Sequence, residues 1–250
     1  MVLLTFNIVN NKSDFKKGHF LSEEELVHIT VQNAASILRM LEFNNILATF
    51  FVDISLVEKI QPILKKMISN GHELALYNTN ATLSEIETAK KSAEDLTGKM
   101  IRGIRQKDLL VSVEDLKTSG FTYISNIENA DILFPFKRLK RSTEISLQHG
   151  LHVIPESISP YSQIPYNDFV FQVLPLKYYE NMVLETIKND DFVVVYLNTW
   201  QFTDAEKHGF DIPFYRRYHS GRKMENKLED FLLWINEEHL AYSRMKDFIF

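Results

Sequence analysis

A few side chains that could bind or transform a ligand stand beside apolar, strand-like segments of this sequence. Tyr77 and Trp200 each follow such a segment and could form an aromatic platform for a sugar ring, or pack in the core. Arg105 could bind an anionic or sugar group, or be held by a structural carboxylate. His72 could contact a ligand, or make a structural hydrogen bond. For Tyr77, Trp200 and His72 the structural role is the more common one for such residues, and for Arg105 the two roles are evenly balanced.

Metal-ligand patterns are weak in this sequence. It contains no cysteine, which excludes disulfides, thiolate metal sites and cysteine catalysis. The histidines other than His72 and His28 are scattered without the spacing of a ligand set: His19, His149, His152, His208, His219 and His239. The residues alone therefore predict no metal site.

The elements that must position the candidate residues are clearest between residues 48 and 83. Segment 48–52 is apolar and β-branched and predicts a buried strand. Segment 57–69 has a helical apolar face, and Asn70 and Gly71 end it with a left-handed turn. A second strand then begins at Gly71 and leads into a polar loop. This is a β/α unit, and loops at the C-terminal ends of such strands carry the chemistry of β/α barrels.

The rest of the chain continues the alternation of strands and helices. Strands are expected at 2–9, 46–52, 101–105, 121–125 and 192–197, with edge strands at 144–145 and 153–157. Helices are expected at 22–41, 57–69, 83–98, 113–119, 178–188 and 224–235. No repeat or linker divides the chain, so we expect one α/β domain over residues 1–250.

The motifs resemble those of the polysaccharide deacetylases, the NodB homology group of carbohydrate esterase family four. The resemblance rests on ATFFV and GHEL about one helix apart, on TGK followed by GIR, on GFTYIS, and on the segment NTWQF that follows the strongest strand. These motifs occupy residues 48–52, 71–74, 97–99, 103–105, 120–125 and 198–202. The resemblance implies a distorted (β/α) barrel and the hydrolysis of N-acetyl groups on amino-sugar glycans.

That family uses a divalent metal such as zinc, a carboxylate base, an arginine that orients the base, and a histidine acid. By motif, the base position is Asn7, the arginine is Arg105 and the acid position is Asn198. The metal-ligand positions are Ile8, Tyr77 and Ala81. An asparagine cannot take a proton from water, and an isoleucine or alanine side chain cannot bind zinc. The resemblance therefore implies a deacetylase fold with a dismantled metal site and no cofactor.

These observations favour a glycan-binding or regulatory homologue that has lost the family reaction. Its expected ligand is a glycan or amino sugar, and Tyr77, Trp200 and His72 are the candidate binding residues. The alternative is an active hydrolase with a relocated or atypical site. A third possibility, a subunit that pairs with an active paralogue as its protein partner, cannot be separated from the first by sequence.

Composition limits the partners and the location. The formal net charge of −5 gives no reason to expect nucleic acid as a partner. No apolar run approaches the roughly 20 residues that a membrane span needs. The N-terminal segment lacks the basic start of a signal peptide, so a cytoplasmic protein is expected.

Overall fold

The computed structural model describes residues 1–10, 15–16, 18, 20–106, 110–126 and 143–249 of the chain. The strands are β1 (Val2–Ile8), β2 (Thr49–Asp53), β3 (Glu73–Asn78), β4 (Gly103–Gln106), β5 (Tyr123–Asn126), β6 (Ser146–Gln148), β7 (Leu151–Ile154) and β8 (Val193–Asn198). The α-helices are α1 (Glu23–Phe43), α2 (Gln61–Ser69), α3 (Leu83–Thr97), α4 (Val113–Thr118), α5 (Asp168–Val173), α6 (Leu176–Asp190), α7 (Phe214–Tyr218), α8 (Arg222–Glu237) and α9 (Met245–Ile249). Two short 3₁₀ helices are η1 (Ile54–Leu56) and η2 (Thr199–Phe202).

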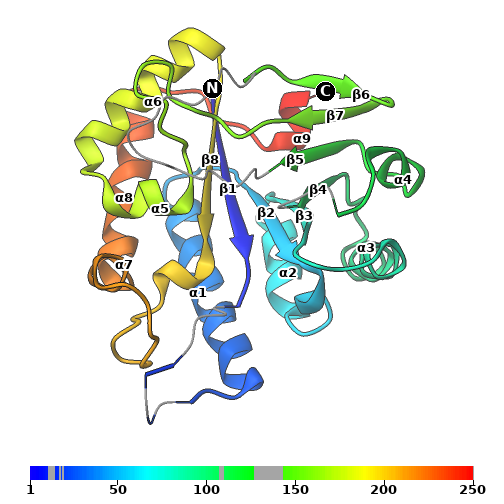
Figure 1. Cartoon of the computed structure of the whole chain (residues 1–250), viewed down its shortest axis with the longest axis horizontal. Coiled ribbons are helices and arrows are strands. Elements are labelled where there is room, and N and C mark those ends of the chain that lie inside the picture. The colour runs from blue at the N-terminus through cyan, green and yellow to red at the C-terminus, as the bar shows by residue number, and fades with distance from the viewer. Residues whose placement is uncertain (11–14, 17, 19, 107–109, 127–142, 250) are drawn as a thin grey trace.

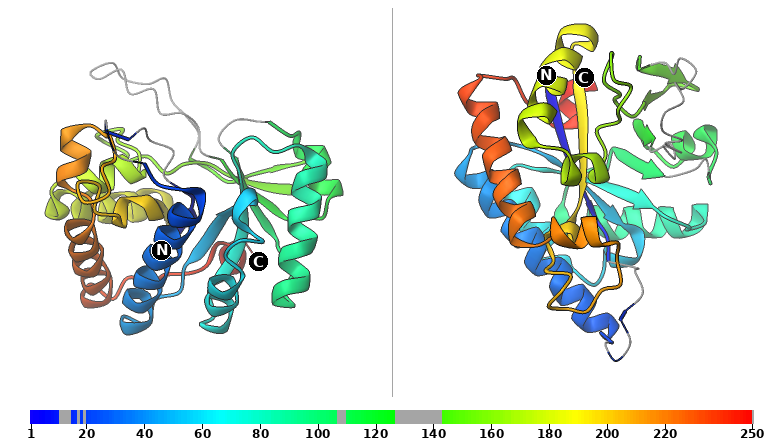
Figure 2. Two further views of the ribbon diagram at one scale, coloured as in Figure 1. Left: turned by 90° about the horizontal axis from the view of Figure 1, so that it is seen from below. Right: turned by 60° about the vertical axis from the view of Figure 1, so that its left-hand side comes forward.

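One curled sheet organises the molecule, with helices packed around its outer side (Figure 1, Figure 2). Its strand order is β6-β7-β5-β4-β3-β2-β1-β8, and only the β6–β7 pair is antiparallel. The expected distorted (β/α) barrel is therefore confirmed. The expectation of an edge strand at 153–157 was wrong, because β7 lies between β5 and β6. The short strand β6 forms that edge instead.

The sheet ends at β8, and the segment that follows β7 lies against this strand without forming a ladder with it. On the side of β8 away from β1, the Val194 amide donates to Ser157 Oγ (2.9 Å) and the Tyr196 amide donates to the Tyr166 carbonyl (3.2 Å). The segment that follows β7 thus satisfies the backbone of β8, which would otherwise be an open edge. We call this contact between residues 157–166 and β8 the seam.

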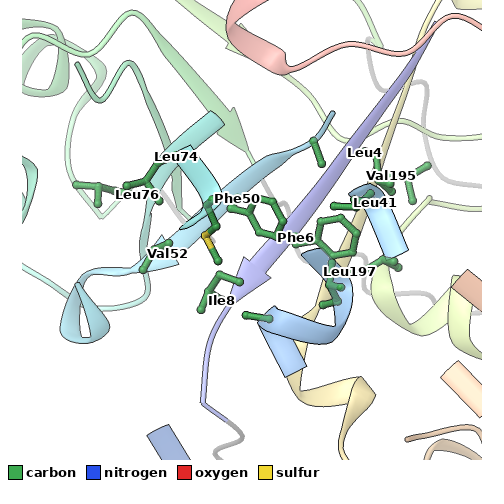
Figure 3. Packing of buried hydrophobic residues seen from close by; sticks show 14 of the residues in the cluster. Leu4, Phe6, Ile8, Leu41, Phe50, Val52, Leu74, Leu76, Val195 and Leu197 are labelled. Atoms are coloured by element: carbon green, nitrogen blue, oxygen red, sulfur yellow. The ribbon is translucent and has the colours of Figure 1, made fainter. Parts of the chain in front are cut away.

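Alternation along each strand divides the apolar core into two layers. Odd positions of β1, such as Leu3, face the barrel interior with Phe51 and Val194. Even positions, such as Phe6 and Ile8, face the helices in the larger cluster (Figure 3). Any side chain that acts inside the barrel must therefore come from the inward-facing positions.

Local signals fix the boundaries of several helices. Ser22 and Glu25 form the expected capping box of α1. Gly71 turns the chain after α2 with φ +86°, as expected from its left-handed preference. Helix α2 begins at Gln61 rather than at residue 57, because η1 precedes it and a proline occupies its first turn.

The C-terminal segment covers the N-terminal end of the barrel. Met245 enters the interior cluster, and its amide donates to Thr49 Oγ1 (2.9 Å). The next amide, of Lys246, donates to Glu73 Oε2 (3.0 Å). This end is therefore filled, and the opposite end, where the parallel strands finish, is the place for a site. None of the helices in the described ranges is long and apolar enough to cross a membrane.

Candidate functional site

The inward-facing positions become polar toward the C-terminal ends of the strands, a region that we call the mouth. On β1, Thr5 and Asn7 follow Leu3 on the interior face, and both are buried. Asn7 is paired in register with Asn198 of β8. Arg105 of β4 lies next to Tyr77 of β3. The fold therefore brings together the candidate residues Asn7, Tyr77, Arg105 and Asn198.

Arg105 crosses the barrel interior and is almost fully buried, with 1 % of its surface exposed. Its Nη1 donates to Asn7 Oδ1 (2.8 Å) and Thr5 Oγ1 (3.0 Å). Its Nε and Nη2 both donate to Ser125 Oγ, at 3.1 and 2.8 Å. The guanidinium also stacks over the Phe51 ring, 3.8 Å from its centroid. Its hydrogen-bond partners are thus neutral groups, and the Glu156 carboxylate is near enough to favour the charged form of the guanidinium.

Burial lowers the pKa of Arg105 to about 10, while nearby Tyr196, Tyr77 and Glu156 act in the opposite direction. The side chain is still charged at neutral pH. A carboxylate at position 7 would be the natural counter-ion for this guanidinium, and Asn7 supplies a neutral amide in its place.

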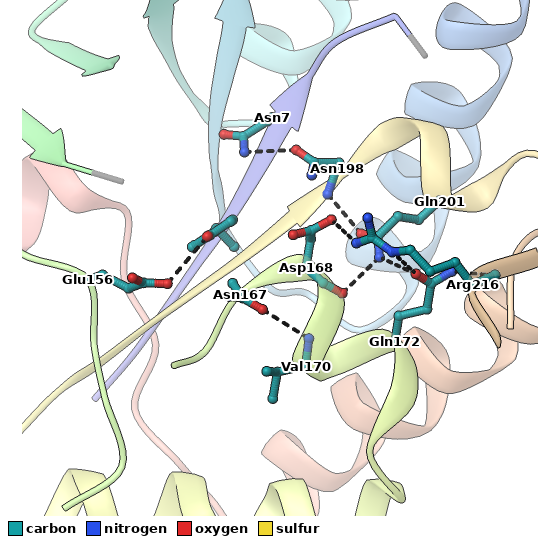
Figure 4. Close-up of polar contacts among 10 residues, drawn as sticks. Asn7, Glu156, Asn167, Asp168, Val170, Gln172, Asn198, Gln201 and Arg216 are labelled. Carbon is teal, nitrogen blue, oxygen red and sulfur yellow. Dashed lines mark hydrogen bonds and ion pairs between the residues drawn. The ribbon is translucent and has the colours of Figure 1, made fainter. Parts of the chain in front are cut away.

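A chain of amides extends from Asn7 out of the barrel (Figure 4). Asn7 Nδ2 donates to Asn198 Oδ1 (2.9 Å), and the backbone N–H of Asn198 donates to Gln201 Oε1 (3.0 Å). Gln201 Nε2 donates to the Asp168 carbonyl (2.8 Å). Arg216 ends the chain by pairing with the Asp168 carboxylate, Nη2 to Oδ2, at 2.6 Å. The amides fix one another's orientation. The side chain of Asn7 is therefore held with its oxygen toward Arg105 and its nitrogen toward Asn198.

Tyr77 lies among ionisable groups at the mouth. It is paired in register with Asp53 at the end of β2. Burial raises the pKa of the Tyr77 hydroxyl, Arg105 acts to lower it, and Asp53 and Asp168 act to raise it. Two carboxylates are thus close enough to influence Tyr77. Asp53 itself is engaged, because it accepts from the Ser55 amide (2.9 Å) and from Thr79 Oγ1 (3.2 Å).

Trp200 and Ala81 occupy the loops beside the mouth. Trp200 is partly buried beneath Arg216, whose guanidinium carbon is 4.9 Å from the Trp200 ring centroid. Ala81 closes the loop after β3, where its amide donates to Asn78 Oδ1 (2.7 Å). Trp200 therefore presents a ring that is already partly covered by a cation.

His72 lies at the other end of the strands, away from the other candidates. It directly precedes β3, its Nδ1 accepts from the Ala48 amide (3.2 Å), and its ring contacts Phe50 edge-on. Glu73 is buried beside it and accepts from Tyr123 Oη (2.9 Å). The structure therefore does not bring His72 to the site where a binding role was predicted, and its contacts there are those of a core residue.

The protonation of His72 should make the stability of the fold depend on pH. Burial lowers its pKa to about 4, with a further contribution from Arg244. The unfolded chain then binds more protons than the folded chain between about pH 6.5 and 4, so stability falls as pH falls. We expect a loss of about 2–3 kcal/mol between pH 7 and 4.5, measured by urea unfolding.

The matched variant is His72→Gln, whose amide oxygen can accept from Ala48 but does not titrate. The raised pKa of buried Glu73 acts in the opposite direction at acidic pH in both proteins. The difference between wild type and His72→Gln therefore isolates the histidine. A difference that does not change from pH 7 to 4.5 would contradict the assignment.

The residues at the metal-ligand positions do not fit a divalent metal. Ile8 faces away from the interior and packs in the helix-side cluster (Figure 3). Ala81 offers no donor side chain, and Tyr77 has a raised pKa that disfavours a phenolate ligand. Among the described residues, no group of three or more histidine, aspartate or glutamate side chains is arranged to hold a metal ion.

Sequence reasoning missed several residues of the mouth. Asp53, Tyr196 and Asp168 lie outside the motifs, and Ser125 ends the motif GFTYIS without having been singled out. Ser125 and Tyr196 could have been found from strand alternation, because they share the interior face with Tyr123 and Val194. Asp168 follows Asn167, which caps α5 by accepting from the Val170 amide (Figure 4). An asparagine such as Asn167 in front of an apolar segment is a signal for the start of a helix, so α5 could have been predicted.

Comparison with known proteins gives a result at the level of fold. No protein-family model matches the chain, and no curated protein matches it. Among solved structures, a probable polysaccharide deacetylase from Pseudomonas aeruginosa PAO1 is 12% identical with TM-score 0.63, covering 98% of this chain and 88% of its own. The allantoinase PuuE is 12% identical with TM-score 0.65, covering 98% and 87%.

A pseudoenzyme of carbohydrate esterase family four from Bacillus anthracis is also similar. It is 10% identical with TM-score 0.50, and the match covers 99% of this chain and 64% of that protein. At such identities the likeness concerns the fold alone. The chain therefore has the fold of the polysaccharide deacetylases, a NodB-type (β/α) barrel.

Proposed function

We propose that this protein is a polysaccharide deacetylase homologue that binds a glycan at its mouth and does not hydrolyse it by the metal-dependent family reaction. The observation that carries the proposal is Asn7. It stands at the position of the base, inside the barrel, with its amide bonded to Arg105 and Asn198.

The chemistry of these groups supports binding rather than hydrolysis. An amide has no accessible basic form, so Asn7 cannot activate water. Asn198 stands at the position of the acid and cannot donate a proton to a leaving amine. The donor set at Ile8, Tyr77 and Ala81 does not fit a metal that would otherwise acidify a bound water.

Two observations support a glycan as the ligand, namely the aromatic side chains near the mouth and the structures to which the chain is similar. Tyr77 and Trp200 supply aromatic surface near the mouth, and aromatic rings with a polar edge suit sugars. Similar structures include a probable polysaccharide deacetylase and a family pseudoenzyme. The allantoinase with the same fold means that the fold by itself does not fix the ligand.

The test combines metal content, hydrolysis and binding on one preparation. After loading with zinc or cobalt and desalting, we expect less than one metal per chain. With an N-acetylated chitooligosaccharide we expect no release of acetate but measurable binding by calorimetry. Stoichiometric metal together with acetate release would overturn the proposal, and so would the absence of binding to every glycan tested.

A second candidate is an atypical hydrolase, and one observation favours it. Asp53 and Asp168 both influence Tyr77, so ionisable groups do converge near the mouth. This candidate predicts acetate release that disappears in Asp53→Asn and Asp168→Asn. Release that is unaffected by both changes would exclude these carboxylates. A protein partner remains a prediction without a surface assigned to it.

A further inference from the structure

Helix α7 presents an unusual aromatic surface beside the mouth. Phe214, Tyr215 and Tyr218 are 70, 49 and 56 % exposed, although the helix has only five residues. Figure 2 shows this helix in orange, and its Arg216 lies over Trp200 of η2, which directly follows β8. Large apolar side chains that are grouped on a surface mark a binding site more often than isolated ones do.

Contacts beneath the helix hold this surface in place. Arg216 of α7 pairs with Asp168 and lies over the rings of Trp200 and Phe169, at 4.9 and 5.3 Å from their centroids. Its Nε also donates to Gln172 Oε1 (3.3 Å). Tyr215 packs edge-on against Phe169 (5.9 Å between centroids). The exposed rings are therefore preorganised, which lowers the entropy lost when a ligand binds.

The same surface carries four cations, of which two have an ion-pair partner among the described residues. Arg216 has Asp168 as its partner, and Arg222 has Glu225. In contrast, no carboxylate in the described ranges lies within ion-pair distance of Arg217 or Lys223. Lys223 lies over the Tyr218 ring, 3.0 Å from its centroid. These cations stand out in a chain whose formal net charge is −5.

We propose that Phe214, Tyr215, Tyr218, Arg217 and Lys223 form a binding surface for a polysaccharide that bears carboxylate groups. The apolar faces of its sugar rings pack on the exposed aromatic rings, and Arg217 binds a carboxylate through its planar fork. This inference rests on the proposed function, since it takes the ligand to be a glycan. It adds that the glycan is negatively charged and that the surface of α7 binds it.

The experiment measures calorimetric binding of an oligogalacturonate and of a neutral chitooligosaccharide by the full chain. We expect the double variant Tyr215→Ala/Tyr218→Ala to bind the oligogalacturonate about 10-fold more weakly. Arg217→Gln should weaken it about 5-fold at low salt, with less effect at high salt, because screening reduces the interaction of exposed charges. Arg217→Gln should weaken binding of the neutral oligosaccharide less than binding of the oligogalacturonate, because the neutral ligand has no carboxylate for Arg217 to bind.

The matched control is Phe43→Ala/Lys66→Ala, which removes an exposed ring and an exposed cation near the C-terminal ends of α1 and α2. Circular dichroism checks that every variant is folded. Glycan binding that is equal in wild type and in the α7 variants overturns this inference and leaves the proposed function standing. No binding of either oligosaccharide by wild type overturns the proposed function, and the inference with it. Tighter binding to phosphatidylglycerol vesicles than to the oligogalacturonate also overturns the inference.

Discussion

Replacing Arg105 with methionine is expected to lower the free energy of unfolding by about 2–4 kcal/mol. Two opposing effects decide whether the substitution lowers or raises the free energy of unfolding. Burial disfavours the charged guanidinium and lowers its pKa to about 10, even though nearby tyrosines and Glu156 act to raise it. Against this, hydrogen bonds from a charged group contribute about 1.5–3 kcal/mol each, and Arg105 donates to Thr5, Asn7 and Ser125. We expect the hydrogen bonds to be the larger effect.

Urea unfolding measures this change, with Arg39→Met as the control. Arg39 is exposed on α1, and its loss should change stability by less than about 0.5 kcal/mol. Arg105→Lys should recover little of the lost stability. The ammonium group of lysine lacks the planar fork of donors with which the guanidinium reaches three acceptors. If Arg105→Met were as stable as wild type or more so, the hydrogen bonds would not offset the buried charge. The arginine would then have to be explained by function rather than by stability.

The second large effect is expected at Gly103, whose missing side chain leaves room for a ring. A Cβ atom at this position would lie 2.0 Å from Tyr123 Cζ and 2.2 Å from Tyr123 Oη. Tyr123 is fully buried and donates to Glu73 Oε1 (2.9 Å), so the ring cannot move without breaking that bond. We expect Gly103→Ala to destabilise the fold by about 3 kcal/mol or more, measured by urea unfolding.

Gly98→Ala separates the steric effect from backbone strain. Gly98 has φ +63°, and no neighbouring side chain in the described ranges comes within 4 Å of the place that a Cβ atom would take. Only its left-handed conformation is therefore penalised, by about 1 kcal/mol. In addition, Tyr123→Leu should reduce the further cost of Gly103→Ala, because the two residues occupy the same space. Additive effects of the two changes would mean that the ring and the methyl group do not compete.

Much of the fold could be predicted because its signals are local. The apolar run at 192–197 predicted a buried parallel strand, and Ser22 with Glu25 predicted a helix start. Errors arose where tertiary pairing decides the outcome. Whether β7 is an edge depends on β6, and β6 has only three residues, all exposed. Helix α7 was not predicted, because its aromatic residues face solvent and give no amphipathic pattern.

The candidate site was predictable in its members but not in its bonding. Motif spacing identified Asn7, Arg105 and Asn198, which the fold brings together. The partners Thr5 and Ser125 come from strands about 100 and 20 residues away from Arg105 in sequence, and no local pattern links them to it. The same limit applies to His72, whose motif is intact although its side chain lies at the far end of strand β3.

The seam gives the barrel one boundary that can open without breaking a β-ladder. The amide hydrogens of Val194 and Tyr196 point to Ser157 and Tyr166, whereas the Val193 amide is bonded across to the Met1 carbonyl. Native-state hydrogen exchange could therefore follow the two sides of one strand separately. Faster exchange at the even positions of β8 than at its odd positions would reveal a barrel that widens along this line, changing the diameter of its interior while the rest of the sheet stays intact.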